Sequence, residues 1–329
     1  MGSKRKLLPA ISDVIDRLQV KSALDAFSGS SCVAYLMKQK GLRVTANDFL
    51  TFAYQIAHAT IENNHERLDS DDISLLMREN PNRNRFIETT FRNLYFSNTD
   101  NRFLDLFWAN LSQIRSPYKR SLALAAAHRA CLKRRPRGVF TYTGPRYDDG
   151  RADLRKTLKQ QFIEAAQAWN NAIFDNGQPN RAFNEDVFEL EAGQHDLVYI
   201  DPPYLTPRSD NEYTRRYHFV EGLATYWRSA QIQTDTVTKK IKRKETPFGS
   251  KQTVYRAFDR VFEKFSDSIL LVSYGSAGIP NRNEIVDILQ TYKRRVRVYE
   301  YDYVYSFGTH SHKLNNTSNR VSEYLFLAR

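Results

Sequence analysis

The pattern of apolar and polar positions predicts an α/β fold at the start of the chain. Residues 23–27 form a short apolar run, and residues 43–48 form a second one. Between them, residues 32–40 are predicted to form a helix that Gly41 would end as its C-cap. Two strands joined through one helix imply a parallel pair with a right-handed crossover.

A long helical section follows, from about residue 49 to residue 180. Its apolar residues recur at helical spacing in two stretches, around residues 103–114 and 158–173. Between these stretches, the segment 138–150 is rich in turn-forming residues and is predicted to be a loop or a hairpin. The pattern therefore indicates a mainly helical insertion within an α/β sequence.

The sheet pattern returns after residue 180. Two buried strands, one helix and two closing strands are predicted, in this order, at 195–200, 268–273, 283–292, 295–305 and 323–328. Nothing helix-forming separates the closing strands, so we expect them to pair as an antiparallel hairpin at the sheet edge. A change of apolar parity near Val298 favours a bulge there. The expected fold is a Rossmann-like sheet, mostly parallel with a C-terminal antiparallel hairpin.

Length and composition limit the class of protein. With 329 residues, 41% of them hydrophobic and 26% charged, the chain has room for one large α/β domain and a smaller one. No apolar run reaches the roughly 18 residues of a membrane helix and no secretory signal opens the chain, so we expect a cytoplasmic protein without membrane association. Two cysteines, Cys32 and Cys131, cannot build a disulfide framework or a standard zinc site, so no metal is expected.

The charge balance points to nucleic acid. The formal net charge is +12, and the excess is clustered in three runs, at 133–137, 239–244 and 293–295. Such clusters are typical of nucleic-acid binders, and 20 phenylalanines and 19 tyrosines offer surfaces on which bases can stack. Any single run is equally compatible with a solvated surface.

The most specific motif follows the strand at 195–200 directly. It consists of Asp201, Pro202, Pro203 and Tyr204. Open α/β sheets bind ligands at this end of their strands. The two prolines fix the backbone and remove two N–H donors, so the loop is rigid and rich in acceptors. The alternative is a structural double-proline turn with a capping aspartate.

These four residues suit methylation of the amino group of a base. The amino nitrogen of adenine is a poor nucleophile because its lone pair is delocalised into the ring. Asp201 and the Pro202 carbonyl can each accept one amino hydrogen, so that the nitrogen can attack a methyl sulfonium in line. Tyr204 offers a face for a base that has left the duplex. Alignment and preorganised electrostatics would supply most of the rate gain.

A second constellation lies around the first two strands. The turn after residues 23–27 contains small residues that let a ligand approach the backbone, and the helix N-terminus behind it favours an anionic group. Asp48 ends the second strand, where an acid accepts the ribose hydroxyls of a nucleoside cofactor. Asp186 could meet the adenine of that cofactor, with Phe188 beside it. A plain tight turn and surface acids are the alternatives.

In this order, the motifs resemble those of the Dam-type (alpha-group) adenine-specific DNA methyltransferases, in which the cofactor loop precedes the catalytic tetrad. The similarity extends over nearly the whole chain, and the middle helical section is its least specific part. It rests on the segment 2–9 with Lys4, the loop 27–30, Asn47 and Asp48, Asp186, the tetrad, Tyr217 and His218, the strand end 272–274 and the segment 323–326.

The resemblance implies transfer of a methyl group from S-adenosyl-L-methionine to N6 of a flipped-out adenine in DNA. Residues 1–50 and 181–329 would form the catalytic domain, and residues 51–180 a helical target-recognition domain. Lys4 would bind the methionine carboxylate, Asp48 the ribose, and Asp201 both cofactor and adenine. The implied catalytic residues are Asp201, Pro202, Pro203 and Tyr204. The implied cofactor-binding residues are Lys4, Asp25, Phe27, Ser28, Gly29, Ser30, Asp48, Asp186 and Asp201.

The basic region 205–253 behind the tetrad is expected to close over the flipped base or to grip flanking phosphates, with a surface loop as the alternative for 234–250. The candidate DNA-contacting residues are Arg134, Arg135, Tyr213, Arg216, Tyr217, Lys242 and Arg243.

The chain departs from the family pattern at two places. The family usually has a second glycine where this chain has Ser31, which would narrow the cofactor loop or change its hydrogen bonding. The amino-terminal motif of the family also begins earlier, with an aromatic that lines the cofactor pocket, and Met1 starts too late to include it. Either the chain is shortened, or cofactor affinity relies on other residues.

Double-stranded DNA is the expected partner, with a cognate restriction endonuclease or a second methyltransferase as further candidates. One alternative is an enzyme of the same fold that methylates an RNA adenine, a cytosine amino group or a protein amide; Asp201 favours adenine, because the cytosine enzymes more often have serine there and the protein-amide enzymes asparagine. A non-catalytic nucleic-acid-binding module would be expected to lose the tetrad or Asp48. A nicotinamide-dependent oxidoreductase would need the full glycine fingerprint, which is missing.

Overall fold

The chain folds into two compact units, which we call the α/β unit and the helical unit. The α/β unit comprises Gly2–Phe49, Asn176–Glu212 and Lys244–Arg329, and the helical unit comprises Leu50–Asp175 and Tyr213–Arg243. This computed structural model describes residues 4–143, 148, 150–193, 195–206, 213–228, 230–304 and 320–329. Residues 213–243, which the sequence analysis grouped with the catalytic domain, thus lie in the helical unit.

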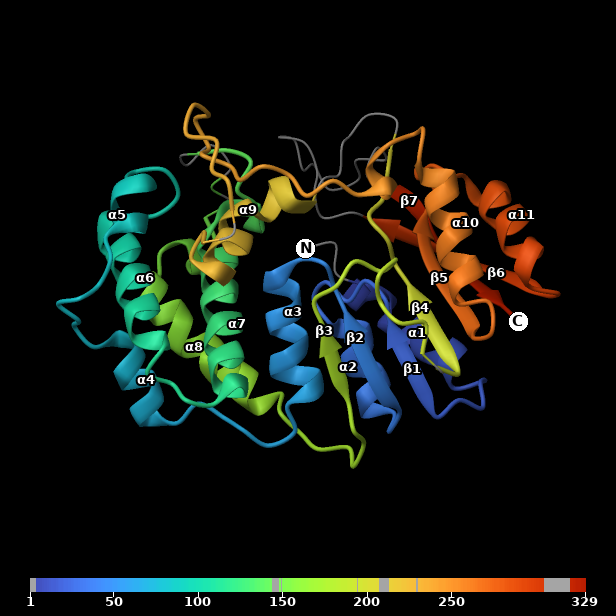
Figure 1. The fold of residues 1–329 in the computed structure, drawn as a ribbon, viewed down its shortest axis with the longest axis horizontal. Coiled ribbons are helices and arrows are strands. Elements are labelled where there is room, and N and C mark those ends of the chain that lie inside the picture. The colour runs from blue at the N-terminus through green and yellow to red at the C-terminus, as the bar shows by residue number, and fades with distance from the viewer. Residues whose placement is uncertain are drawn as a thin grey trace. The chain divides into compact units, whose positions relative to one another are not determined.

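A seven-stranded sheet forms the centre of the α/β unit (Figure 1). Its strands are β1 (Ser22–Asp25), β2 (Arg43–Asn47), β3 (Arg181–Phe183), β4 (Leu197–Ile200), β5 (Ile269–Gly275), β6 (Val296–Val304) and β7 (Arg320–Ala328). They are arranged in the order β3-β2-β1-β4-β5-β7-β6. β7 is antiparallel to β5 and to β6, and the other neighbours are parallel. The predicted fold class is confirmed.

Helices pack against this sheet. Those of the α/β unit are η1 (Lys4–Leu7), α1 (Leu8–Ile15), α2 (Cys32–Gln39), η5 (Pro247–Gly249), α10 (Val254–Lys264) and α11 (Arg282–Tyr292). Side chains alternate between the faces of a strand, and on one face Leu24 and Val198 join a core with Phe258 of α10 and Leu289 of α11. α2 packs against β1, β2 and α1. Gly41 follows α2 with a left-handed φ of 79°, as expected of a C-cap glycine.

The C-terminal hairpin pairs without a bulge. Its register is unbroken from Val296 opposite Ala328 to Val304 opposite Arg320, so the predicted bulge near Val298 is wrong. β6 is the edge strand, and consecutive residues Val298 and Tyr299 are both partly exposed. A partly solvated edge accepts apolar residues on both faces, which explains the change of parity without a change of register.

The helical unit is built around α7. Its helical segments are α3 (Thr51–Ala57), the π-turn η2 (His58–Glu62), α4 (Ser70–Met77), α5 (Phe86–Thr90), α6 (Asn98–Leu111), α7 (Pro117–Arg134), η3 (Pro136–Gly138), η4 (Ala152–Leu154), α8 (Leu158–Asn171) and α9 (Tyr213–Thr225). Every residue of α7 from 121 to 128 is buried, and most are alanine or leucine. These small side chains let α3, α8 and α9 pack closely against α7.

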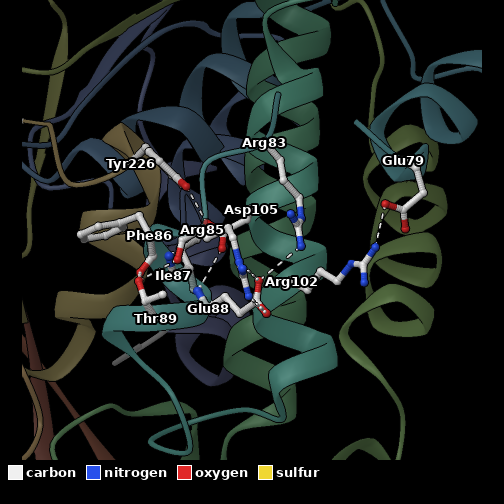
Figure 2. Close-up of polar contacts among 10 residues, drawn as sticks. All are labelled: Glu79, Arg83, Arg85, Phe86, Ile87, Glu88, Thr89, Arg102, Asp105 and Tyr226. Carbon is white, nitrogen blue, oxygen red and sulfur yellow. Dashed lines mark hydrogen bonds and ion pairs between the residues drawn. The ribbon is translucent and has the colours of Figure 1, made fainter. Parts of the chain in front are cut away.

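A buried carboxylate holds the short helix α5 in place (Figure 2). Asp105 of α6 accepts hydrogen bonds from the backbone N–H groups of Ile87, at 3.0 Å, and Glu88, at 2.9 Å. The hydroxyl of Tyr226 donates a further bond to Asp105 at 2.5 Å. Burial raises the pKa of Asp105, and the three donors offset part of that cost. They thereby link α5, α6 and the segment after α9.

The helices differ from the sequence expectation at three places. The predicted helical stretches correspond to α6 and α8, whereas α1, α9 and α10 were not anticipated. In the segment 138–150 the described residues contain no strand, and residues 144–147 and 149 lie outside the description. No described helix is both long and apolar enough to cross a membrane.

The buried imidazole of His128 predicts acid sensitivity of the helical unit. Burial lowers the pKa of His128 to about 3, against an ordinary value near 6.5. Between these values the unfolded chain binds a proton that the folded chain rejects, so the free energy of unfolding falls with falling pH by up to about 1.4 kcal/mol per pH unit. His128→Leu should flatten this slope in denaturant titrations between pH 7 and 4. His65→Leu is the control, because the side chain of His65 is 75% exposed; equal slopes in all three proteins would contradict the prediction.

Candidate active site

Three carboxylates meet at one edge of the sheet. Asp25 ends β1, Asp48 follows β2 and Asp201 follows β4. β1 pairs in parallel with both β2 and β4, so the carboxyl ends of all three strands lie side by side. The structure therefore brings the first βα unit and the tetrad together at the edge where open α/β sheets bind ligands.

The tetrad is held by a buried polar cluster. The ammonium of Lys4 lies 3.3 Å from Oδ1 of Asp201 and 3.1 Å from Oε2 of Glu323, a residue of β7. Lys4 also donates a hydrogen bond to the hydroxyl of Tyr204, which donates to Oε2 of Glu323 at 2.9 Å. The ring of Tyr204 packs against Tyr274 with centroids 4.6 Å apart. Glu323 and Tyr274 were not among the site residues expected from the sequence, although the segments 272–274 and 323–326 carried part of the resemblance.

This cluster sets the charge of Asp201. Burial raises the pKa of Asp201, Lys4 lowers it and Glu323 raises it, with a result of about 6. Burial opposes the charge of Lys4, but Asp201 and Glu323 together raise its pKa above the usual value. At neutral pH, Asp201 is therefore a carboxylate paired with a lysine ammonium, which leaves it able to accept hydrogen bonds.

The turn after β1 is shaped by the neighbouring strand. Asp48 accepts a hydrogen bond from the backbone N–H of Gly29 at 2.8 Å, and the N–H of Ser28 donates to the carbonyl of Asn47 at 2.8 Å. Gly29 and Ser31 both have left-handed backbones, with φ values of 48° and 57°. Position 31, where the family usually has glycine, thus demands the conformation that glycine adopts most readily. Serine adopts that conformation here.

Several buried polar atoms around this turn have no hydrogen-bond partner in the described structure. They are Oδ1 of Asp25 and the hydroxyl oxygens of Ser28 and Ser31. The other oxygen of Asp25 accepts from the N–H of Ala34, in the first turn of α2, at 3.1 Å. Burial and the charge of Asp201 raise the pKa of Asp25 to about 8. Unsatisfied buried polar groups are costly, and here they form a set that fits the polar end of a bound ligand.

A pocket lies next to this turn. It is lined by Ala26, Phe27, Asn47, Phe49, Glu185, Asp186, Val187, Pro203, Thr246 and Phe248. Phe248 stacks in parallel on Phe188, with centroids 5.9 Å apart, and meets Phe27 edge-on at 5.4 Å. Asp186 accepts the backbone N–H of Phe188 at 3.0 Å, so it also fixes the local turn. Thr246 and Phe248 come from the segment 234–250, for which a surface loop was the alternative expected from the sequence.

The candidate DNA-contacting residues fall into two groups. Arg135 is only 3% exposed, and its guanidinium donates to the carbonyl of Tyr142 at 2.7 Å. Arg134 donates to the carbonyl of Leu154 and lies 3.8 Å from Asp100. Tyr217 is 1% exposed and packs against Phe52. Arg135 and Tyr217 are therefore parts of the core of the helical unit, and Arg134 is bound at its surface.

The second group remains accessible to a ligand. Tyr213 and Arg216 of α9 are partly exposed, whereas Lys242 and Arg243 are exposed. Ile232 and Ile241 form an antiparallel bridge, and the N–H of Lys242 donates to the carbonyl of Gln231 at 2.8 Å. Part of the run 234–250 is thus an ordered hairpin-like segment, on which the two exposed cations lie.

Asp25 should destabilise the free protein at neutral pH. Its folded pKa lies above the unfolded value, so stability increases as pH falls through about 8 and is lowest above it. Asp25→Asn removes the charge, and the melting temperature at pH 8 should rise by about 2–4 °C for each kcal/mol recovered. Asp13→Asn, at an exposed position of α1, is the control. A gain that is equally large at pH 5 would show that the charge of Asp25 is not its cause.

Comparison with known proteins agrees with this geometry. The family model of the D12 class N6 adenine-specific DNA methyltransferases matches residues 1–288. The type II methyltransferase M2.HphI of Haemophilus parahaemolyticus is 30% identical over 99% of this chain and 96% of its own length. The modification methylase StsI of Streptococcus sanguinis is 27% identical over 89% of this chain and 46% of its own, and the type II methyltransferase M.FokI of Planomicrobium okeanokoites is 25% identical over 99% and 52%. The chain spans about half of these last two relatives.

The tetrad after β4, its carboxylate among the ends of three parallel strands, and a family match over most of the sequence agree with one another. The chain belongs to the D12 class N6 adenine-specific DNA methyltransferases.

Proposed function

We propose that the methyl donor of this adenine-specific DNA methyltransferase is S-adenosyl-L-methionine and that its acceptor is an adenine flipped out of duplex DNA. The observation that carries the proposal is the position of Asp201, at the sheet edge next to both the turn after β1 and the pocket lined by Phe27 and Asp186. A nucleoside cofactor and a flipped base would therefore meet at one carboxylate.

The α/β unit offers a group for each part of the donor. The buried unpaired atoms of Asp25, Ser28 and Ser31 fit the polar amino-acid end. Asp48, already oriented by the N–H of Gly29, is the candidate for the ribose hydroxyls. The aromatic pocket with Phe27 suits the adenine ring. When bound, S-adenosylmethionine supplies an electrophilic methyl group on a sulfonium.

Three other assignments for the donor have less local support. Lys4, expected at the methionine carboxylate, lies between Asp201 and Glu323, so this role would require it to share its ammonium with a further anion. Gly29 and Ser30 complete the turn and would let the donor approach the backbone. Asp186 would act from the rim of the pocket.

The tetrad residues would act by holding the amino group. The carboxylate of Asp201 accepts one amino hydrogen of adenine and the carbonyl of Pro202 accepts the other, so that the nitrogen lone pair leaves the ring system and points at the methyl group. Pro203 keeps the loop rigid, and Tyr204 provides the stacking face. The methylated nitrogen then loses its proton to solvent. No strong general base is required, since alignment and fixed acceptors lower the barrier.

Replacement of the carboxylate tests this mechanism directly. Asp201→Ala should reduce transfer of labelled methyl groups from S-adenosylmethionine to DNA by a factor of at least about 100, because an acceptor and its charge are both lost. The melting temperature of the variant checks that the fold is intact. Sequencing of the modified positions identifies the methylated base and its context. Near-normal turnover of Asp201→Ala would remove Asp201 from the catalytic site, and modification of cytosine or RNA alone would redirect the proposal to those substrates.

We further propose that the hairpin-like segment 231–243 contacts DNA phosphates through Lys242 and Arg243. Both side chains are exposed, and Ile241, which bridges to Ile232, is buried, so the segment has a fixed anchor and a cationic surface. Thr238 accepts a hydrogen bond from the hydroxyl of Tyr95, which adds a second anchor. Arg216 and Tyr213 of α9 are further candidates.

Phosphate contacts predict a change in salt dependence. Each contact contributes a slope of about −0.9 to the plot of log affinity against log salt concentration, so Lys242→Ala/Arg243→Ala should flatten the slope by nearly two. Lys21→Ala/Arg295→Ala is the control of equal charge, because both residues are exposed and lie at the amino ends of β1 and β6, away from the strand ends that carry Asp25, Asp48 and Asp201. Binding isotherms of duplex DNA from about 50 to 200 mM salt measure the slopes. An unchanged slope in the first variant would reject the phosphate contacts.

The relatives also suggest a cellular setting. Their names identify type II methyltransferases and modification methylases. We propose that this chain likewise modifies DNA in a restriction-modification system, with a restriction endonuclease or a second methyltransferase of the same specificity as its partner.

A further inference from the structure

We propose that Glu323 is a positioning residue for methyl transfer: from β7 it fixes both the ammonium of Lys4 and the ring of Tyr204 next to Asp201. The inference rests on the proposed catalytic role of Asp201. A single oxygen, Oε2 of Glu323, lies 3.1 Å from the ammonium of Lys4 and 2.9 Å from the hydroxyl of Tyr204. The same ammonium lies 3.3 Å from Asp201. One carboxylate thus orients both the ammonium of Lys4, which contacts the catalytic loop, and Tyr204, which belongs to that loop.

The sheet topology explains how a residue so distant in sequence reaches this loop. β7 is antiparallel to β5, and Glu323 lies opposite Gly275, the last residue of β5. The early part of β7 therefore lies at the same edge as the carboxyl ends of the parallel strands. A parallel strand in this place would bring its last residues, not its first, to that edge.

Glu323 is an expensive residue to use for structure alone. It is 1% exposed, and a buried carboxylate costs several kcal/mol unless its partners compensate for lost water. An apolar residue would fill the interior of an edge hairpin at lower cost. The partners that do compensate, Lys4 and Tyr204, are both next to Asp201. We therefore infer that the buried charge of Glu323 serves the catalytic site.

The ring of Tyr204 is restrained at two places. Its hydroxyl is hydrogen-bonded to both Glu323 and the ammonium of Lys4, and the ring packs against Tyr274 with centroids 4.6 Å apart and an interplanar angle of 62°. Tyr274 is itself fixed by a hydrogen bond from its hydroxyl to the carbonyl of Ile279 at 2.7 Å. A base stacked on Tyr204 would be oriented by the fixed ring. Loss of the hydrogen bond to Glu323 would let the ring move.

The charge of Glu323 also affects the pKa of Asp201, and the direction of this effect is known. Glu323 raises the pKa of Asp201, and Lys4 lowers it. Loss of the Glu323 charge should therefore keep Asp201 ionised to lower pH, and loss of the Lys4 charge should have the opposite effect. The titratable groups that act on Asp201, or on which Asp201 acts, include Lys4 of η1, Asp25 of β1, Tyr199 of β4, Tyr204, Tyr274 of β5 and Glu323 of β7.

Glu323→Gln tests both consequences. The amide oxygen can still accept from Tyr204, but the charge is gone and Lys4 loses an anchor. We expect kcat to fall by roughly 10- to 100-fold, as small misplacements of reacting groups do. The acid limb of kcat/KM, which reports ionisation in the free enzyme, should move to lower pH. In Lys4→Met the limb should move to higher pH. Glu323→Asp keeps the charge but shortens the side chain, so its limb should stay in place while kcat falls.

Glu300→Gln is the matched control, since Glu300 is an exposed residue of the same hairpin and its substitution should change neither kcat nor the acid limb. Melting temperatures of the free proteins measure stability separately. If Glu323→Gln lowers only the melting temperature and leaves kcat and the acid limb at their wild-type values, Glu323 is structural and the inference is overturned. If Asp201→Ala retains turnover, the catalytic role of Asp201 fails instead, and the two failures are distinguishable.

Discussion

The structure of the α/β unit depends on how it accommodates several carboxylates in a poorly solvated place. Parallel pairing of β1 with β2 and β4 brings Asp25, Asp48 and Asp201 to one edge, and like charges in a low dielectric raise one another's pKa. The unfavourable interaction among these charges is reduced in a different way at each carboxylate. Asp25 has a pKa of about 8 and so keeps its proton at neutral pH, Asp48 accepts a backbone N–H, and Asp201 pairs with Lys4.

The pairing with Lys4 ties distant parts of the chain to the catalytic loop. Lys4 comes from η1 at the start of the described chain, and Glu323 comes from the last strand. Neither is near residue 201 in sequence, yet Lys4 lies 3.3 Å from Asp201 and Glu323 lies 2.9 Å from the hydroxyl of Tyr204. The antiparallel strand β7 lies between β5 and β6. Because of its direction, it places the carboxylate of Glu323 beside the carboxyl ends of the parallel strands, where the site lies.

The sequence predicted what is encoded locally. The tetrad directly after an apolar strand, and Asp48 one βα unit after Asp25, are short-range patterns, and from them both the sheet edge and its carboxylates could be expected. Although the segment 323–326 carried part of the resemblance, roles for Glu323 and Phe248 in the site could not be expected, because these roles arise from strand order and from the path of the chain after α9. The two residues belong to segments that resemble an ordinary strand and a polar loop.

The exposure of the basic residues could not be predicted from the sequence either. A run such as 133–137 predicts a cationic surface, but Arg135 is buried among aromatic rings, with its guanidinium 5.2 Å from the centroid of Tyr95 and 5.0 Å from that of Tyr142. The cation–π contact with Tyr95 joins residues that are far apart in sequence. Lys242 and Arg243, in a similar run, stay exposed because the bridge between Ile232 and Ile241 buries their apolar neighbour instead. The number of charged residues in a run therefore does not tell whether its side chains are buried, as Arg135 is, or exposed, as Lys242 and Arg243 are.

The unsatisfied atoms around the turn after β1 connect the stability of the protein with its function. Ser31 is held in a left-handed conformation, and buried oxygens of Asp25, Ser28 and Ser31 have no partner in the described structure. Each of these features costs about 1–3 kcal/mol in the free protein. A fold selected for stability alone would replace them, for instance with glycine at position 31 and apolar or amide side chains beside it. Their concentration within one turn, beside the catalytic carboxylate, is what a site prepared for a polar ligand requires, since binding would satisfy together the groups that folding leaves unpaired.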